Sequence, residues 1–299
     1  MNAFTGHLKP RFLYITELKE KHGNIPEIAN LIYRCEEEIK TYERGINPPL
    51  GVNSPLHHAV RDGMPAVFIS KIMNCGADIN EQNSFGENVI HLCLRFISSD
   101  YSPTKEKNYK MLFDDLIKYG ANKDCRDNAG KPPFFNYLPK FSAQKFIFNL
   151  IDEYKVNFVA KDHENNTILH NLAKNFIPVG TNEPDELMGF VICKGVNIND
   201  INHQQNTALM ENIIADYDLK KYEQTIYLIH AGTDLSVINK DGNTVKDLIG
   251  INSLNMRPSN QRRYNAIIEA LSTKMIPDSS LESTSSSPLV VINNARTPT

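Results

Sequence analysis

The chain has 299 residues, of which 41% are hydrophobic and 22% are charged, so it is long enough to bury a sizeable core. Its formal net charge is −3, its basic residues are scattered, and no apolar run approaches the length of a membrane span, which argues against nucleic acid as a partner and against a spanning helix. The five cysteines show no metal-like pairing, which predicts reduced thiols in a cytosol-like compartment. We therefore expect a cytoplasmic protein without a signal peptide.

Residues 1–48 are expected to form a helical cap. Ile28 lies three and four residues before Leu31 and Ile32, and Cys35 lies four and three residues after them, within 26–44. This is the pattern of an amphipathic helix. Such a segment can cover the apolar end of a stack of repeats. The same region offers an alternative, because residues 25–28 begin like an F-box-like adaptor motif.

A helix-turn-helix unit begins at Ser54. Ser54 can cap a helix, Pro55 suits the first helical position, and Leu56 starts an apolar face. Gly76 suits the left-handed residue that ends a second helix.

This pattern returns five times, with first helices starting near residues 88, 132, 167, 207 and 244. The steps are roughly 34 to 44 residues, so a period near 33 carries insertions. The insertions at 98–108 and 175–184 are either neutral surface loops or contact loops with Tyr101, Phe176 and Ile177 as apolar anchors.

Residues 54–59, Ser-Pro-Leu-His-His-Ala, and 76–80, Gly-Ala-Asp-Ile-Asn, resemble the signature of the ankyrin repeat. The resemblance covers residues 51–272 and implies an all-α solenoid of about six helix-turn-helix repeats, with hairpin turns projecting to one side. It also implies that His57, His91 and His170 hydrogen-bond the turns. The third repeat departs most, with Pro-Phe-Phe-Asn at 133–136 and no glycine after its second helix.

The domain plan that follows is a helical cap at 1–48, an ankyrin repeat domain at 49–273 and a disordered Ser/Thr-rich tail at 274–299. The closing helix is expected at 262–271. The serines and threonines from residue 279 on bury too little surface to order themselves.

No catalytic residue, metal site or cofactor is predicted. The signature histidines lie in different repeats rather than around one ion. Cys93 lies two residues from His91, and residues two apart on a helix point in different directions. The acidic turns at 124–127 and 161–164 are better explained by turn hydrogen bonding than by acid-base catalysis.

We expect recognition to lie on the concave surface made by hairpin tips and first helices. Phe85 stands out, because a large apolar residue at a turn tip has no core to enter. The candidate protein-binding residues are Gln82, Ser84, Phe85, Arg126, Asn128, Lys161, His163, His203, Gln205 and Lys240 on the hairpins, with His58, Arg61 and Arg95 on the first helices.

Three hypotheses about function remain open. The leading one is a non-enzymatic, monomeric protein-binding module. It resembles bacterial secreted ankyrin effectors of virulence that bind a host protein, and this resemblance implies secretion into the cytoplasm of a host cell without a signal peptide. The second is a viral or eukaryotic ankyrin adaptor that recruits a ubiquitin ligase through a terminal segment. The third, an ankyrin array attached to an enzyme, is disfavoured because about 50 residues outside the repeats are too few for an ordinary catalytic domain.

Overall fold

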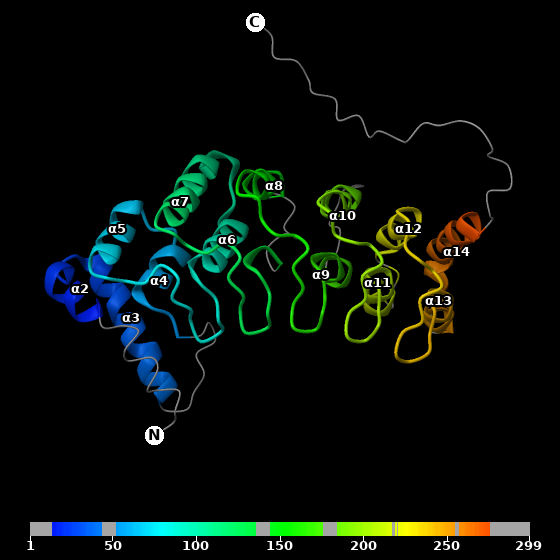
Figure 1. Cartoon of the computed structure of the whole chain (residues 1–299), viewed down its shortest axis with the longest axis horizontal. Coiled ribbons are helices and arrows are strands. Elements are labelled where there is room, and N and C mark those ends of the chain that lie inside the picture. The colour runs from blue at the N-terminus through cyan, green and yellow to red at the C-terminus, as the bar shows by residue number, and fades with distance from the viewer. Residues whose placement is uncertain are drawn as a thin grey trace, which may run out of the picture.

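The computed structural model of the chain describes residues 14–43, 52–135, 144–175, 184–216, 219, 221–254 and 257–275. These residues form pairs of helices stacked side by side, and the hairpin loops between the pairs project from the same side of the stack (Figure 1). The described segments contain no β-strand. The all-α solenoid expected from the sequence is therefore confirmed.

The N-terminal cap consists of α2 (Tyr14–His22) and α3 (Pro26–Glu43). The apolar stripe of α3 is buried, with Ile28 and Cys35 at 0% exposure. Helix α3 packs on α4 of the first repeat, and α2 contacts α5. The cap thus continues both rows of helices by one layer (Figure 1).

Within the described residues, six pairs of helical elements follow the cap, and the first element of the third pair is a 3₁₀ turn. Their bounds are α4 (Pro55–Arg61) with α5 (Ala66–Asn74); α6 (Val89–Asp100) with η1 (Pro103–Lys105) and α7 (Glu106–Lys118); η2 (Pro133–Phe135) with α8 (Gln144–Glu153); α9 (Ile168–Asn175) with α10 (Pro184–Cys193); α11 (Ala208–Ala215) with α12 (Tyr222–His230); and α13 (Val245–Leu254) with η4 (Pro258–Asn260) and α14 (Gln261–Met275).

The first helices start where the capping pattern predicts. Ser54 and Asn88 each accept a backbone N–H from the third residue of their helix, and the histidine there accepts the cap's own N–H in return. These reciprocal bonds satisfy donors that a helix start otherwise leaves unpaired.

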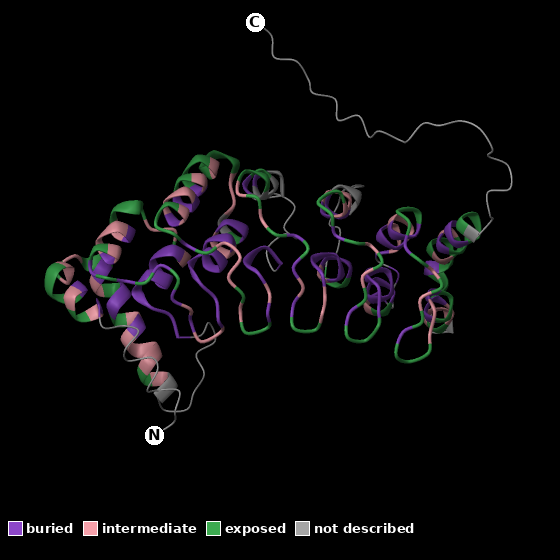
Figure 2. Cartoon of the chain, in the orientation of Figure 1, coloured by how far each residue is buried: buried purple, intermediate pink, exposed green. Residues whose placement is uncertain are grey.

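Burial repeats with the same register. The residue two positions after each of the first five caps is at most 1% exposed, and these residues are Leu56, Ile90, Phe134, Leu169 and Leu209. The core is therefore a line of equivalent apolar side chains, and buried residues run along the whole stack (Figure 2).

The insertion of the second repeat lengthens this repeat without exposing its predicted anchor. Tyr101 is half-buried and stacks on Tyr109 with ring centroids 6.2 Å apart. Its hydroxyl donates to Glu106, so the ring packs inward. Phe176 and Ile177, and the tail from residue 276 on, lie outside the described residues.

The third repeat departs from the others as its sequence predicts. A single 3₁₀ turn, η2, is described where other repeats begin an α-helix. After α8, Lys155 takes the left-handed conformation at φ 49°, where the other repeats use glycines, as at Gly120 with φ 89°. A side chain is strained in that conformation.

Lys155→Gly should therefore stabilise the chain, by about 0.5–1 kcal/mol in a urea melt, because glycine adopts the left-handed conformation at no steric cost. The matched control is Gly120→Ala, where nothing lies within 4 Å of the new methyl, so only the backbone cost remains, about 1 kcal/mol of destabilisation. Loss of stability in Lys155→Gly would contradict the strained cap.

Candidate functional site

Each hairpin turns around one Asn or Asp side chain. Its Oδ1 accepts the backbone N–H groups of the residues two and four positions later, at 2.8–3.1 Å. These turn residues are Asn83, Asp127, Asp162, Asn202 and Asn239. The interpretation of Asp127 and Asp162 as turn residues is confirmed.

Neighbouring hairpins are tied together at their tips. From the second hairpin on, the residue after the turn Asn or Asp donates its backbone N–H to a carbonyl of the preceding hairpin. These bonds run from Asn128 to Phe85, His163 to Ala129, His203 to Glu164 and Lys240 to Gln204, at 2.9–3.0 Å. The backbone at these four sequence-predicted binding residues is therefore fixed, while their side chains are exposed.

The signature histidines are buried and bonded as the resemblance implies. In His57, Nδ1 accepts the backbone N–H of Ser54 at 3.2 Å, and Nε2–H donates to the Glu81 carbonyl at 3.1 Å. His91 and His170 reach the carbonyls of Lys131 and Asn206 at 3.3 and 3.0 Å. Burial lowers the pKa of His57 to about 3 and also lowers the pKa of the other two rings, so all three are neutral at pH 7.

Burial also argues against Cys93 and His91 as a catalytic nucleophile and base. Cys93 is fully buried, and burial raises the pKa of its thiol well above the usual range. A buried neutral thiol is a poor nucleophile. Over the residues that the structure places, no group of three His, Cys, Asp or Glu side chains could hold a metal ion.

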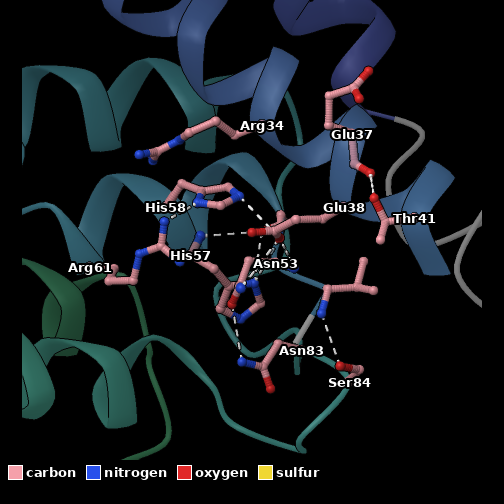
Figure 3. A network of polar contacts seen from close by, with 12 residues as sticks. Arg34, Glu37, Glu38, Thr41, Asn53, His57, His58, Arg61, Asn83 and Ser84 are labelled. Atoms are coloured by element: carbon pink, nitrogen blue, oxygen red, sulfur yellow. Dashed lines mark hydrogen bonds and ion pairs between the residues drawn. The ribbon is translucent and has the colours of Figure 1, made fainter. Parts of the chain in front are cut away.

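His58, which we expected to contact a partner, is instead covered by the N-terminal cap. This residue has no exposed surface, because α3 covers α4, and its Nε2 lies 3.3 Å from the Glu38 carboxylate (Figure 3). Arg61 donates to its Nδ1 at 2.8 Å. His58 therefore joins the cap to the first repeat and is not available to a partner, contrary to our expectation.

The charges at this junction shift one another's pKa. Burial lowers the pKa of His58, although Glu38 acts in the other direction. Burial alone raises the pKa of Glu38, but His58, the Asn53 N–H and Arg61 together bring it below its ordinary value. Glu38 also accepts the Asn53 N–H at 2.8 Å. The cap is thus held by a carboxylate with several donors.

Most of the polar candidates on the hairpins brace the repeats internally. Gln82 donates to the Gly86 and Arg126 carbonyls at 2.6 and 2.8 Å. Arg126 donates to the carbonyls of Gly130 and Lys161, and Lys161 pairs with Asp200 at 3.0 Å. These side chains hold hairpins in register.

Three further candidates are also engaged or partly covered. Arg95 pairs with Glu87, and the Ser84 hydroxyl accepts the Val52 N–H at 2.9 Å. Phe85 is half-buried, whereas Gln205 is exposed at a left-handed turn position with φ 60°.

Two rows of equivalent positions reveal residues that the sequence analysis missed. The hairpin row is the residue directly before each turn Asn or Asp: Gln82, Arg126, Lys161, Ile201 and Ile238. The helix row is the seventh residue after each described cap position: Arg61, Arg95, Lys174, Ile214 and Ile251. Both rows are polar up to the fourth repeat and change to isoleucine in the fifth and sixth.

These four isoleucines are exposed, at 40% for Ile201, 46% for Ile214, 57% for Ile238 and 49% for Ile251. Ile201 and Ile238 lie on two neighbouring hairpins that are bonded at their tips through Lys240. Ile214 and Ile251 lie on α11 and α13, which pack on each other. We call these four residues the isoleucine surface. The sequence analysis selected polar and aromatic residues, whereas comparison of equivalent positions in the repeats would have found them.

Solved structures share this fold. An ankyrin repeat domain from Acinetobacter baumannii is 22% identical, with a TM-score of 0.51 over 74% of this chain and 97% of that one. The ankyrin repeat protein EF0377 is 15% identical, with a TM-score of 0.51 over 73% and 96% of the two chains. The chain therefore has the ankyrin-repeat fold.

No family model matches the chain, and no curated protein matches it. Among the helices that the structure describes, none is both long and apolar enough to cross a bilayer.

The buried histidines predict how stability depends on pH. Their folded pKa values lie below the ordinary value of 6.5, so below about pH 6.5 the unfolded chain binds more protons than the folded one. The free energy of unfolding should fall between pH 6.5 and 5.5 by up to about 1.4 kcal/mol per pH unit for each ring. Urea melts at both pH values measure this slope.

The matched pair of variants is His170→Gln and His203→Gln. The first removes a buried ring whose pKa is lowered and should reduce the slope, and the second makes the same substitution at an exposed hairpin tip as the control for the change of residue itself. Equal stability of the wild-type chain at pH 6.5 and 5.5 would contradict the account.

Proposed function

We propose that this chain is a non-catalytic protein-binding module whose main contact is the isoleucine surface. The observation that carries the proposal is the change from polar residues to isoleucine in both rows at the same repeat boundary. Because Gln82, Arg126 and Arg95 occupy the same positions in earlier repeats, the fold itself does not require an apolar side chain there.

The four isoleucines have the character of an interface centre. Each leaves roughly half of its surface in water, and burial of such a side chain contributes about 1–2 kcal/mol. Groups at the margins can form a polar rim, with Lys240 and His203 exposed at the hairpin tips and Lys174 pairing with Glu211 at 3.6 Å. An apolar centre with a polar rim is the usual anatomy of a protein interface.

The internal bonds of the earlier repeats support this role. Gln82 and Arg126 fix one hairpin against the next through backbone carbonyls. A surface that is rigid before binding loses less conformational entropy on association. The braced hairpins therefore serve as a platform and the isoleucines as the contact.

The residues on which the ubiquitin-ligase alternative rests are engaged within the chain. Ile28 has no exposed surface and Ile25 packs against the core. The segment resembling an F-box-like start is used to seat α3 on the repeats. This favours a module that binds its partner through the repeats.

A partner can be found and the surface tested in two steps. A photo-crosslinking amino acid at position 238 would identify the protein that the surface contacts, and the purified partner would then be titrated with variants. Ile201→Lys with Ile238→Lys should weaken binding by about 30-fold or more, because both anchors are lost and charges are placed at the contact. Circular dichroism should stay unchanged, since both side chains are exposed.

Two controls make the titration decisive. Met111→Lys charges an apolar residue of similar exposure, 53%, on α7, and should leave the affinity unchanged. A triple variant of Phe85, Arg126 and His163 tests the earlier repeats. If the isoleucine variants kept full affinity for the partner while the triple variant lost it, the proposal would be contradicted.

We propose further that the partner is a host-cell protein, on the ground that degenerate repeats, an Asn- and Ile-rich composition and a Ser/Thr-rich tail resemble bacterial secreted ankyrin effectors. The tail would then serve as the secretion address.

Deletion of residues 277–299 should abolish delivery into host cells while the purified protein keeps its helical circular dichroism spectrum, because the described helices end at Met275. A translocation reporter fused to the full and truncated chains measures this. Normal delivery of the truncated chain would refute the effector role and leave the binding proposal intact.

A further inference from the structure

The two ends of the stack are finished differently. At the N-terminal end, α2 and α3 cover the first repeat. At the C-terminal end, a groove of about 260 Å³ lies between α13 and α14. Its lining residues are Lys246, Ile249, Gly250, Tyr264, Ile268, Leu271 and Ser272.

The groove arises from two substitutions in the repeat register. The position two residues after the cap is a buried apolar residue in the first five repeats, but it is Lys246, which is exposed, in the sixth. The position six residues after the cap holds buried Val60 and Leu94, but here it is Gly250. Nothing lies within 4 Å of the place where a Gly250 side chain would begin.

Lys246 and Gly250 affect the C-terminal end of the stack in different ways. Lys246 opposes the stacking of another repeat, because its charge would be buried. Gly250 leaves a hollow beside Ile268, which is 37% exposed. Because Ile249 and Leu271 form the buried wall, an aliphatic occupant would find apolar contacts.

The chain itself supplies such an occupant. Residues 276–299 follow directly after α14, and their one run of four consecutive apolar residues is Leu289–Ile292. Ser272 lines the groove and α14 ends at Met275, so the run is tethered close to it. The intervening residues can span up to about 45 Å when extended, which is ample reach.

Charge favours the same fit. Asp278 and Glu282 are acidic residues in the stretch before the apolar run. Lys246 and Arg262 are exposed beside the groove and at the start of α14. Opposite charges on the tether and on the end of the stack would raise the local concentration of the run.

We propose that Leu289–Ile292 docks in the groove between α13 and α14 and closes the C-terminal end of the stack in cis. Docking orders only the apolar run, and the Ser/Thr-rich stretch before it remains the tether. In this arrangement the tail covers the end of the sixth repeat, as α2 and α3 cover the end of the first.

Hydrogen exchange of the full chain tests the docking. Amides of 289–292 should exchange about tenfold more slowly than those of 283–287, since only the docked run is shielded. Val290→Asp with Val291→Asp should remove the difference, whereas Leu281→Asp, a charge placed in the tail outside the run, should preserve it. Equal exchange of the two stretches in the wild-type chain would overturn the proposal.

A groove variant separates docking from folding. Gly250→Leu fills the hollow and improves helix propensity, so it should keep or raise the melting temperature while it displaces the run and speeds exchange at 289–292. If residues 289–292 kept their protection from hydrogen exchange in this variant, the run would not lie in the groove and the proposal would be overturned. Protection that grows with protein concentration would place it on a second copy and likewise overturn docking in cis.

Discussion

The structure depends on one small motif, an Asn or Asp side chain that accepts two backbone N–H bonds inside its hairpin. Because this closes the turn, the tip carbonyl faces the next hairpin and receives its N–H, as Ala129 does from His163. The same closure places a second carbonyl where the ring of the preceding repeat's histidine can donate to it, as Lys131 receives His91. In the first, second and fourth repeats, turn, histidine and helix start are thus one hydrogen-bonded unit. The turn motif itself recurs at all five described hairpins, and its repetition sets the spacing of the exposed rows.

Much of this could be predicted from the sequence, because the motif is local. Ser54 and His57 are three residues apart, and the strain at Lys155 follows from a missing glycine. What could not be predicted depends on residues far apart in the chain. His58 is covered by Glu38 of α3. Arg126 donates a hydrogen bond to the Lys161 carbonyl, 35 positions later in the chain. A polar residue that looks free for binding in the sequence can instead be hydrogen-bonded to a neighbouring repeat. Residue type alone does not reveal whether the side chain is free or bonded.

The isoleucine surface shows the opposite error. Ile201 and Ile251 look like core residues in sequence, but they occupy positions that earlier repeats give to polar side chains. The hairpin bases do not follow this division, because Asn80 and Asn199 accept a backbone N–H of the next repeat, whereas the equivalent residue of the third repeat, Val159, is an exposed aliphatic. The change from polar to aliphatic side chains is therefore confined to the two rows, where it places exposed apolar area on the fifth and sixth repeats.

The central claim is that a partner buries the isoleucines of the fifth and sixth repeats. Methyl NMR of isoleucine-labelled chain, titrated with the partner, tests it most directly, because each isoleucine reports on its own surroundings. The account predicts large shifts for Ile201, Ile214, Ile238 and Ile251, with the core methyl groups of Ile69 and Ile90 unmoved. Shifts confined to repeats one to four, with those four resonances unchanged in the complex, would contradict it.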